Sequence, residues 1–509
     1  MSDPGVDGRT ARELAGSLRA VLRAAEHQLI DEDAPLLRMI TDHIGCPVGE
    51  IPNVAAQWPS WEHANLQRGV EAYLAEHSPE ATWFGVSGMG RGHQDLIDML
   101  AMAATGMYQL GAVDYASVAV GPRHSIDAVQ FGLVRTAAPD GTPVVIGMRG
   151  APPHHEPVCG LQVLARDRAT GSAVRERVEE LIREHDVFRG QVLTFGFSEQ
   201  RGNQLVRFQA RPALAAEEVV LPPGVLDAIE RHVVLAADRS ARLRAAGQHV
   251  KRGLLLHGAP GTGKTHTVRY LMSRLTASTI VVMSGPSLMM IAEATALARR
   301  LQPSVVVVED VDLIAQDRSF APTGHPLLFQ LLNEMDGIGA DVDVTFVLTT
   351  NRVEVLEHAL ADRPGRIDLA VEIPRPDATA RERLLRLYAR KVPLDLPDPA
   401  GLLAATEGVT ASFIRELVRR AVLRAIDAGG DLRVDEPTLR AALDELLDQR
   451  HALTRSILGG PSSGRPAEEA PGEPPGEPAR EPRSRLFPGS IGRPVTPGPQ
   501  PGMFPGPGA

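Results

Sequence analysis

Two adjacent carboxylates stand at the end of a strongly apolar run in this 509-residue sequence. Four valines, residues 305–308, lead directly into Glu309 and Asp310, and Asp312 follows two positions later. A buried strand that ends in adjacent carboxylates can hold a divalent cation and polarise a water molecule. Because side chains alternate along a strand, the two neighbours point to opposite sides, so that one is available to a metal ion and the other to a water.

A glycine-rich segment could bind the phosphates of the substrate on which such carboxylates act. Residues 258–265, GAPGTGKT, match G-x-x-x-x-G-K-[ST] at every fixed position, after the apolar run LLLH and before THTVRYLMSRLT, which is typical of a helix. Backbone N–H groups in such a loop converge on phosphates, and the N-terminus of the next helix favours the negative charge. The nucleotide contacts expected from this loop are Gly258, Pro260, Gly261, Thr262, Gly263, Lys264, Thr265 and His266.

Further motifs follow this loop in a recognisable order. They are PSVVVVEDVDLIA at 303–315, LLNEMDG at 331–337, FVLTTNR at 346–352, ADRPGRIDLAVEIPRPD at 361–377 and TEGVTASFIRELVRRAVLRAI at 406–426. With them, the chain resembles the AAA family of the AAA+ P-loop ATPases, over about two fifths of its length. The Glu-Asp order at 309–310, where Asp-Glu is usual, is similar to that of the bcs-type members. The resemblance implies ATP and Mg²⁺ as cofactors.

The swapped carboxylates leave their roles open. By position, Glu309 takes the magnesium role together with Thr265, and Asp310 takes the water role, with one methylene fewer than Glu to reach the water. Three alternatives follow. A small shift lets Asp310 orient the water, or the reach is too short and turnover is very slow, or Asp312 or a neighbour assists. The first is favoured here, because the other residues expected around the phosphates are present.

The resemblance implies a role for three more positions. Asn351 resembles the residue that bonds the γ-phosphate or the attacking water. Arg363 and Arg366 resemble arginine fingers that reach the ATP of a neighbouring subunit, which implies a homo-oligomeric ring, most often a hexamer. The alternative for both arginines is an ordinary surface ion pair.

Two segments depart from the family pattern. Ala411-Ser412 stands where Gly-Ala is usual near the adenine. The resemblance therefore implies adenine contacts by Gly408 and Ala411 from a motif that this chain matches incompletely. The segment that lines the pore in threading unfoldases carries an aromatic residue, whereas this chain has Leu-Met-Met at 288–290. Apolar side chains of this kind can grip a polypeptide or simply pack in the core.

Composition limits the other function classes. The net charge is -10 and the calculated pI is 5.9, which disfavours general nucleic-acid binding. Cys46 and Cys159 are the only cysteines and form no disulfide framework, and His154, His155 and Cys159 lack the further ligands that a metal site needs. No apolar run is long enough to span a membrane. We therefore expect a cytoplasmic protein with no membrane partner.

The fold class expected is α/β, with a P-loop doubly wound parallel-sheet core and a helical lid. A mixed α+β domain of unknown family precedes the core, and a tail with 14 Pro and 11 Gly follows the lid. The domains expected are residues 1–215 as an N-terminal substrate or adaptor domain, 216–376 as the large ATPase subdomain, 377–455 as the lid and 456–509 as a disordered tail.

Within these domains, three local predictions can be checked. Residues 11–30 and 221–247 are typical of helices, and the glycine-rich residues 85–92 are expected to form a loop. The function expected is Mg-dependent ATP hydrolysis by a ring that remodels or unfolds a protein client through its N-terminal domain or pore. The alternative is an ATP-gated assembly scaffold that hydrolyses slowly. The sequence does not identify the client, a partner protease or the ring size.

Overall fold

The computed structural model describes Ser17 and most of the chain from residue 34 to residue 448. The described ranges are 34–91, 94–151, 158–196, 206–312, 326–354, 366–429 and 431–448. The predicted tail and, apart from Ser17, the predicted helix over 11–30 lie outside them. No helix in these ranges is long and apolar enough to cross a membrane.

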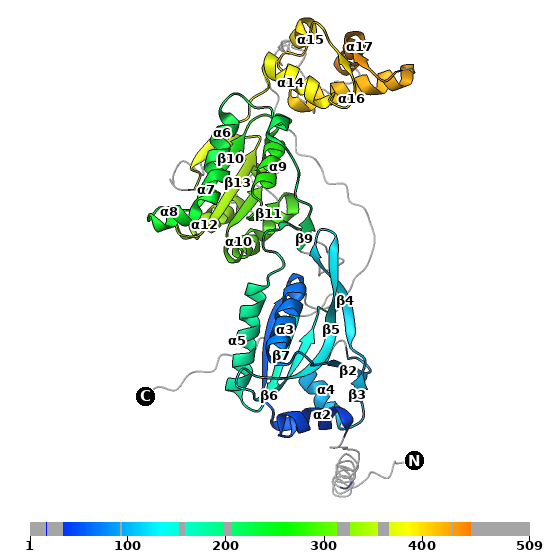
Figure 1. Cartoon of the computed structure of the whole chain (residues 1–509), viewed down its shortest axis with the longest axis vertical. Helices are drawn as coiled ribbons and strands as arrows, with labels where there is room; N and C mark the ends of the chain where they lie inside the picture. The colour runs from blue at the N-terminus through cyan, green and yellow to red at the C-terminus, as the bar shows by residue number, and fades with distance from the viewer. Residues whose placement is uncertain are drawn as a thin grey trace, which may run out of the picture. The chain divides into compact units, whose positions relative to one another are not determined.

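The first of two seven-stranded sheets in the described ranges is antiparallel throughout (Figure 1). Its order is β1-β7-β6-β5-β2-β3, with β4 paired to β5. The strands are β1 (Asn53–Pro59), β2 (Trp83–Gly88), β3 (Tyr108–Gly111), β4 (Asp114–Gly121), β5 (His124–Ala137), β6 (Pro143–Arg149) and β7 (Val158–Ala165). The expectation of a loop over 85–92 was wrong for 85–88, because these residues belong to β2 and pair with β3.

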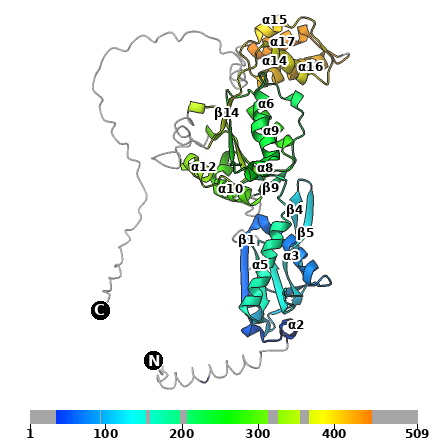
Figure 2. The same ribbon diagram turned by 60° about the vertical axis from the view of Figure 1, so that its left-hand side comes forward.

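Helices cover both faces of this sheet. Helices α3 (His63–His77) and α5 (Arg168–Glu184) lie side by side on one face, as Figure 2 shows. Helices α2 (Pro35–Ile44) and α4 (Leu96–Ala103) pack on the other. Alternation along β6 divides its side chains between the two cores, since Ile146 joins the α3–α5 side and Val145 joins the α2–α4 side.

The second sheet is parallel except at one edge. Its order is β14-β10-β13-β12-β11-β8-β9, and only β9 runs antiparallel to its neighbour. The strands are β8 (Val192–Phe195), β9 (Val206–Gln209), β10 (Arg252–His257), β11 (Thr279–Met283), β12 (Ser304–Val308), β13 (Val344–Thr350) and β14 (Leu369–Glu372). Strand order reverses on the two sides of β10, as expected for a doubly wound fold.

The predicted division at residue 215 does not match this sheet. Strands β8 and β9 precede residue 215, yet β8 pairs with β11 in parallel register, Ile280 opposite Val192. The second sheet therefore begins near residue 190. A short apolar run such as VLTF predicts a strand but does not indicate which sheet that strand joins. For this reason the strand was predicted to belong to the preceding domain.

The helices around the second sheet sit on two cores. Helices α10 (Ile291–Arg300) and α12 (Pro326–Asp336) pack on one, and α9 (Lys264–Arg274) and α6 (Val225–Glu230) on the other. The single helix predicted over 221–247 is instead divided into α6, a π-helical segment at Arg231–Leu235, α7 (Ala236–Asp238) and α8 (Ser240–Ala245).

The lid is a small helical bundle with its own core. Helices α14 (Ala378–Tyr388), α15 (Ala400–Ala405), α16 (Ala411–Ala428) and α17 (Glu436–Leu447) surround it, and β15 (Leu394–Asp395) pairs with β16 (Val434–Asp435). Phe413 of α16 is fully buried there. The predicted fold class, an α/β sheet core with a helical lid, is confirmed.

Candidate active site

The glycine-rich loop runs from the end of β10 to the start of α9. Gly258 has φ +141° and Gly261 has φ +77°, a region that L side chains rarely adopt. A Cβ on Gly258 would lie 2.3 Å from the backbone oxygen of Ile373, and one on Gly261 would lie 2.9 Å from the Ser412 hydroxyl. Both positions therefore require glycine, and the loop has the compact backbone that a phosphate site needs.

Lys264 is the first residue of α9 and is buried. Its Nζ donates to the carbonyl oxygens of Gly258 at 2.8 Å and Ala259 at 3.0 Å, and to Asn351 Oδ1 at 2.8 Å. Burial lowers the pKa of Lys264, and the nearby Asp310 opposes that shift. An ammonium has three donors, so a bound phosphate would take the place of one or more of these partners.

Of the other residues predicted in the loop, Thr262 and His266 make hydrogen bonds to the backbone, and Pro260 is exposed to solvent. Thr262 Oγ1 donates to the Ala259 oxygen at 2.9 Å, which closes the loop on itself. The His266 ring lies 3.0 Å from the backbone oxygen of Glu218, so it connects α9 to the segment between β9 and β10. Pro260 is exposed. Nucleotide contacts by these residues remain a prediction.

Glu309 and Thr265 lie together, as the magnesium prediction requires. The Thr265 side chain bonds Glu309, and the buried Glu309 Oε1 has no hydrogen-bond partner among the residues that the structure describes. Burial raises the pKa of Glu309, and the Thr265 bond opposes it. Hydroxyl and carboxylate oxygens are the hard donors that Mg²⁺ prefers, and Glu309 Oε1 is available as one of them. These two residues therefore fit that ion. No group of three or more His, Cys, Asp or Glu in the described ranges is arranged to hold a metal.

Asp310 has an unusual backbone. Its φ of +54° is positive, and no other described non-glycine residue shares this feature. Its N–H donates to Thr349 Oγ1 at 3.0 Å, and its Oδ1 accepts from Asn351 Nδ2 at 3.3 Å. Left-handed backbone at Asp costs some stability, and such strain concentrates at functional sites. The left-handed turn aims the shorter carboxylate toward Asn351.

Asn351 joins the two halves of this site. Its amide oxygen accepts from Lys264 and its amide nitrogen donates to Asp310, so Asn351 alone bridges the lysine predicted to bind phosphate and the carboxylate predicted to polarise water. Asn351 directly follows β13, whose parallel neighbours β10 and β12 precede the glycine loop and Glu309. Parallel strands thus place all three segments at one edge of the sheet.

Arg366 is buried and forms an ion pair within its own subunit. Its Nε and Nη2 donate to the two carboxylate oxygens of Asp336, at 2.9 and 2.5 Å. The sequence alternative was a surface ion pair, and this pair is instead buried on its Arg366 side; a role for Arg366 in a neighbouring subunit remains a prediction. Arg363 lies outside the described residues.

The lid reaches the glycine loop at the start of α16. The Ser412 N–H donates to the Gly261 oxygen at 3.1 Å, and Arg375 Nη1 donates to the Gly408 oxygen at 2.7 Å. Ala411, which precedes Ser412, therefore stands close to the glycine loop, whereas Gly408 contacts Arg375. Their contact with a base remains a prediction.

The pore candidates at 288–290 differ in exposure. They lie in a 3₁₀ segment, Gly285–Met290, before α10. Leu288 is buried, and Met290 packs partly against the core, whereas Met289 is 46% exposed. Of these three, only Met289 has the exposure that a client contact needs.

Two contacting residues, Thr349 and Thr350, were not predicted, and Asp312 was named only in one of the three alternatives for the carboxylates. Thr349 and Thr350 end β13, and Asp312 follows Asp310. The signal that could have found them is the run of polar residues after a fully buried strand, because such groups must bond one another at the sheet edge.

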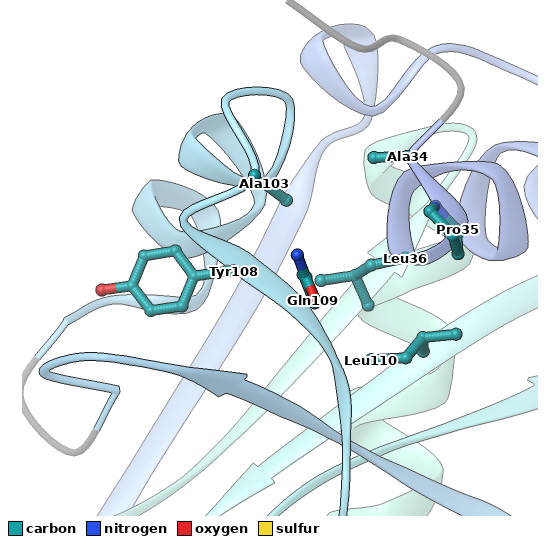
Figure 3. Close-up of a pocket in the computed structure, with 8 residues that line it drawn as sticks. Ala34, Pro35, Leu36, Ala103, Tyr108, Gln109 and Leu110 are labelled. Atoms are coloured by element: carbon teal, nitrogen blue, oxygen red, sulfur yellow. The ribbon is translucent and has the colours of Figure 1, made fainter.

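A cavity of about 290 Å³ lies elsewhere, beside the first sheet (Figure 3). Its lining residues come from the start of α2, the end of α4 and β3. They are Ala34, Pro35, Leu36, Ala103, Gly106, Tyr108, Gln109 and Leu110. None of them carries a charge at neutral pH, so this cavity offers none of the acid–base chemistry gathered around Lys264.

Comparison with known proteins agrees with this geometry. Residues 254–375 match the model of the ATPase family associated with various cellular activities, AAA. The chain carries an AAA domain. The matched range begins in β10 and ends just after β14, so it contains the glycine loop, both carboxylates and Asn351.

Relatives match about two fifths of the chain. The chain is 33% identical over 237 residues to the ATP-dependent zinc metalloprotease FtsH 2 of Symbiobacterium thermophilum. This match covers 43% of this chain and 38% of that protein. The chain is 28% identical over 240 residues to the 26S proteasome regulatory subunit 6A of Encephalitozoon cuniculi, covering 44% and 59%. It is 31% identical over 215 residues to the proteasome-activating nucleotidase of Methanosphaerula palustris, covering 40% and 52%. The match thus spans between 38% and 59% of these relatives' lengths.

Proposed function

We propose that the AAA domain binds ATP and hydrolyses it with Mg²⁺, in a homo-oligomeric ring that remodels or unfolds a protein client. The observation that carries the proposal is the contact of Lys264, Asn351 and Asp310 beside the glycine loop. This arrangement unites a cation for phosphates, an amide that can orient a water and a carboxylate that can polarise it.

The proposed reaction divides its work among these side chains. Lys264 Nζ leaves its loop carbonyls and bonds the β and γ phosphates. The Asn351 amide and the Asp310 carboxylate hold a water in line with the γ-phosphorus. The water oxygen bonds that phosphorus as the bond to the bridging oxygen of ADP breaks. The water's proton is held at the Asp310 carboxylate and then passes to the released phosphate.

Thr265 and Glu309 would hold the metal. When bound, Mg²⁺ neutralises charge on the β and γ phosphate oxygens. The buried Glu309 Oε1, which no other described residue hydrogen-bonds, is the atom that supports this assignment.

The ring and the client are proposed from the relatives and from three side chains. Relatives are named as proteasome regulatory and proteasome-activating proteins, which supports a protein client. The exposed Met289 offers an apolar contact before α10. Arg363 and Arg366 are proposed to complete a neighbour's site, for which Arg366 would have to exchange its Asp336 partner. A cytoplasmic location is proposed with this function.

The test is steady-state ATP hydrolysis measured against protein concentration. Wild-type protein is expected to gain specific activity as subunits assemble. Lys264→Ala, as the site control, is expected to lose nucleotide binding. Arg366→Ala, mixed with wild type in varying ratios, is expected to lower turnover by roughly 10³-fold or more and to poison the mixture. Turnover by wild type no higher than that of Lys264→Ala would overturn the proposal.

A matched variant separates a shared site from a local ion pair. Asp336→Asn disrupts the same pair as Arg366→Ala but keeps the guanidinium. A finger role predicts that Asp336→Asn retains turnover within about tenfold while Arg366→Ala does not. Equal losses in both variants would mean that Arg366 acts only within its own subunit.

The pairing of Arg366 also favours the second candidate, an ATP-gated assembly scaffold with slow hydrolysis. A finger held by its own subunit favours a protein that switches with assembly state. The scaffold predicts ATP-dependent oligomer formation, measured by analytical ultracentrifugation, without stimulation of turnover by an unfolded protein. The remodelling ring predicts that such a client raises turnover.

A further inference from the structure

Asp312 is a buried carboxylate beside the site that the proposed reaction does not use. It is 4% exposed and stands two residues after Asp310, where a helical turn begins. Its Oδ1 accepts two hydrogen bonds, from Thr350 Oγ1 at 3.1 Å and from the Asn351 N–H at 3.1 Å. Both donors belong to the end of β13, so the carboxylate closes the gap between the segments that follow β12 and β13.

The hydrogen bond from the Asn351 N–H to Asp312 holds the Asn351 backbone and so affects where the Asn351 side chain points. The Asn351 N–H lies beyond the last residue of β13, and its hydrogen bond in the described structure goes to Asp312. The same residue's amide contacts Lys264 at 2.8 Å and Asp310 at 3.3 Å. A shift of this backbone would therefore move the amide away from both groups together.

The geometry does not favour a direct chemical role for Asp312. Its Oδ1 is already shared by two donors and its side chain is buried, whereas Asp310 is half-buried and contacts the Asn351 amide. Asp312 also opposes the burial-driven lowering of the Lys264 pKa, although less than Asp310 does. Its charge therefore acts at a distance, and its hydrogen bonds act on Asn351.

We propose that Asp312 is a positioning residue for ATP hydrolysis, which fixes the Asn351 backbone so that its amide stays between Lys264 and Asp310. This inference rests on the proposed function and adds a residue to it. It gives a specific form to the sequence alternative in which Asp312 or a neighbour assists.

The test compares Asp312→Ala, which removes the acceptor, with Asp312→Asn, which keeps an oxygen acceptor and removes the charge. Turnover and binding of a fluorescent ATP analogue are measured for each. Asp312→Ala is expected to lower kcat by roughly 10- to 100-fold, since a displacement of about 1 Å can cost that much, with analogue affinity changed less than about threefold. Asp312→Asn is expected to restore kcat to within about threefold of wild type, because an amide oxygen can still accept both bonds.

A second buried aspartate gives the matched control. Asp343 precedes β13 at the opposite end of the strand, is 3% exposed and bonds Arg252 at 2.7 Å. Asp343→Ala is expected to lower thermal stability and to leave kcat per folded protein unchanged. If Asp312→Ala does not fold, Asp312→Ser, whose hydroxyl is too short to reach both donors, takes its place.

Each outcome separates this inference from the proposed function. Wild-type turnover no higher than that of Lys264→Ala would overturn both. With wild-type turnover established, loss of kcat in Asp312→Asn as large as in Asp312→Ala would mean that Asp312 acts as a base, against this inference. A kcat per folded Asp312→Ala protein equal to wild type would reduce Asp312 to a structural residue.

Discussion

Two seven-stranded sheets in the described chain are similar in size but differ in where their strands end. In the antiparallel sheet, neighbouring strands end at opposite edges and short turns join several of them, such as Asp140-Gly141 between β5 and β6. In the parallel sheet, β10, β12 and β13 all end at one edge, where three polar segments meet. Strand direction alone therefore explains why the candidate chemistry gathers on one sheet and not on the other.

Burial sharpens the difference between the sheets. Every residue of β12 and β13 is buried, and the polar residues Thr349, Thr350 and Asn351 gather where β13 ends. Along β4, intermediate and exposed residues alternate, so polar groups are spread along the strand. A parallel sheet covered on both faces thus concentrates its hydrogen-bonding groups where a ligand can use them.

The largest effect that would test this comparison is expected at Asp310. Asp310→Asn removes the carboxylate that polarises the water, and turnover is expected to fall by roughly 10²–10⁴-fold with ATP-analogue binding retained. Asp140→Asn, in a turn of the first sheet, is the control and should leave turnover unchanged. Unchanged turnover in Asp310→Asn, alongside loss of binding in Lys264→Ala, would place the water elsewhere.

The next effect concerns the core of the first sheet. Leu161→Ala in β7 removes a fully buried side chain and is expected to cost about 2–5 kcal/mol of unfolding free energy. Trp58 and Trp83 pack against this core, so urea unfolding followed by tryptophan fluorescence measures it. ATP-analogue affinity should change by less than about twofold, because distant sites act independently. A larger change would mean that the two sheets are energetically coupled.

A smaller effect is expected from backbone strain. Asp310→Gly and Asp310→Ala both remove the carboxylate, but only glycine adopts φ +54° without cost. The glycine variant is therefore expected to be more stable than the alanine variant by about 1 kcal/mol, measured by chemical unfolding. The opposite order, which is usual outside such turns, would show that the left-handed backbone is not retained.

The smallest effect is a pH dependence in the first-sheet region. His63 is buried and its Nε2 lies 2.9 Å from the Val129 oxygen. Burial lowers the pKa of His63 from its usual 6.5. The unfolded chain therefore binds a proton first as pH falls below 6.5, so this contribution to stability is complete above pH 6.5 and is lost on acidification.

His63→Gln should remove that contribution. The stability difference between wild type and this variant, measured by urea unfolding at pH 7.5 and pH 5.5, should shift against wild type at the lower pH. The buried Glu62 is present in both proteins, so its own titration cancels in the difference. A difference that does not change with pH would mean that His63 titrates normally.

Sequence patterns predicted the parts of the site that short motifs define. Lys264, Glu309 and Asn351 lie where the motif order implies, because each motif names both a residue and the strand that carries it. The partner of Arg366 could not be predicted in this way, since Asp336 is 30 positions away and only the fold brings the two together. Likewise, nothing in the order Glu-Asp indicates a positive φ at Asp310, which follows from the bond to Thr349.

The placement of β8 has a practical consequence for isolating the ATPase part of the chain. A fragment that starts at residue 216 would lack β8 and β9 and would leave the N–H and C=O groups of β11 without their partners at Val192–Thr194. An apolar, unpaired strand edge of this kind recruits other chains, so such a fragment should precipitate or form soluble aggregates. A fragment that starts near residue 186 keeps the edge covered and should remain monodisperse in size-exclusion chromatography.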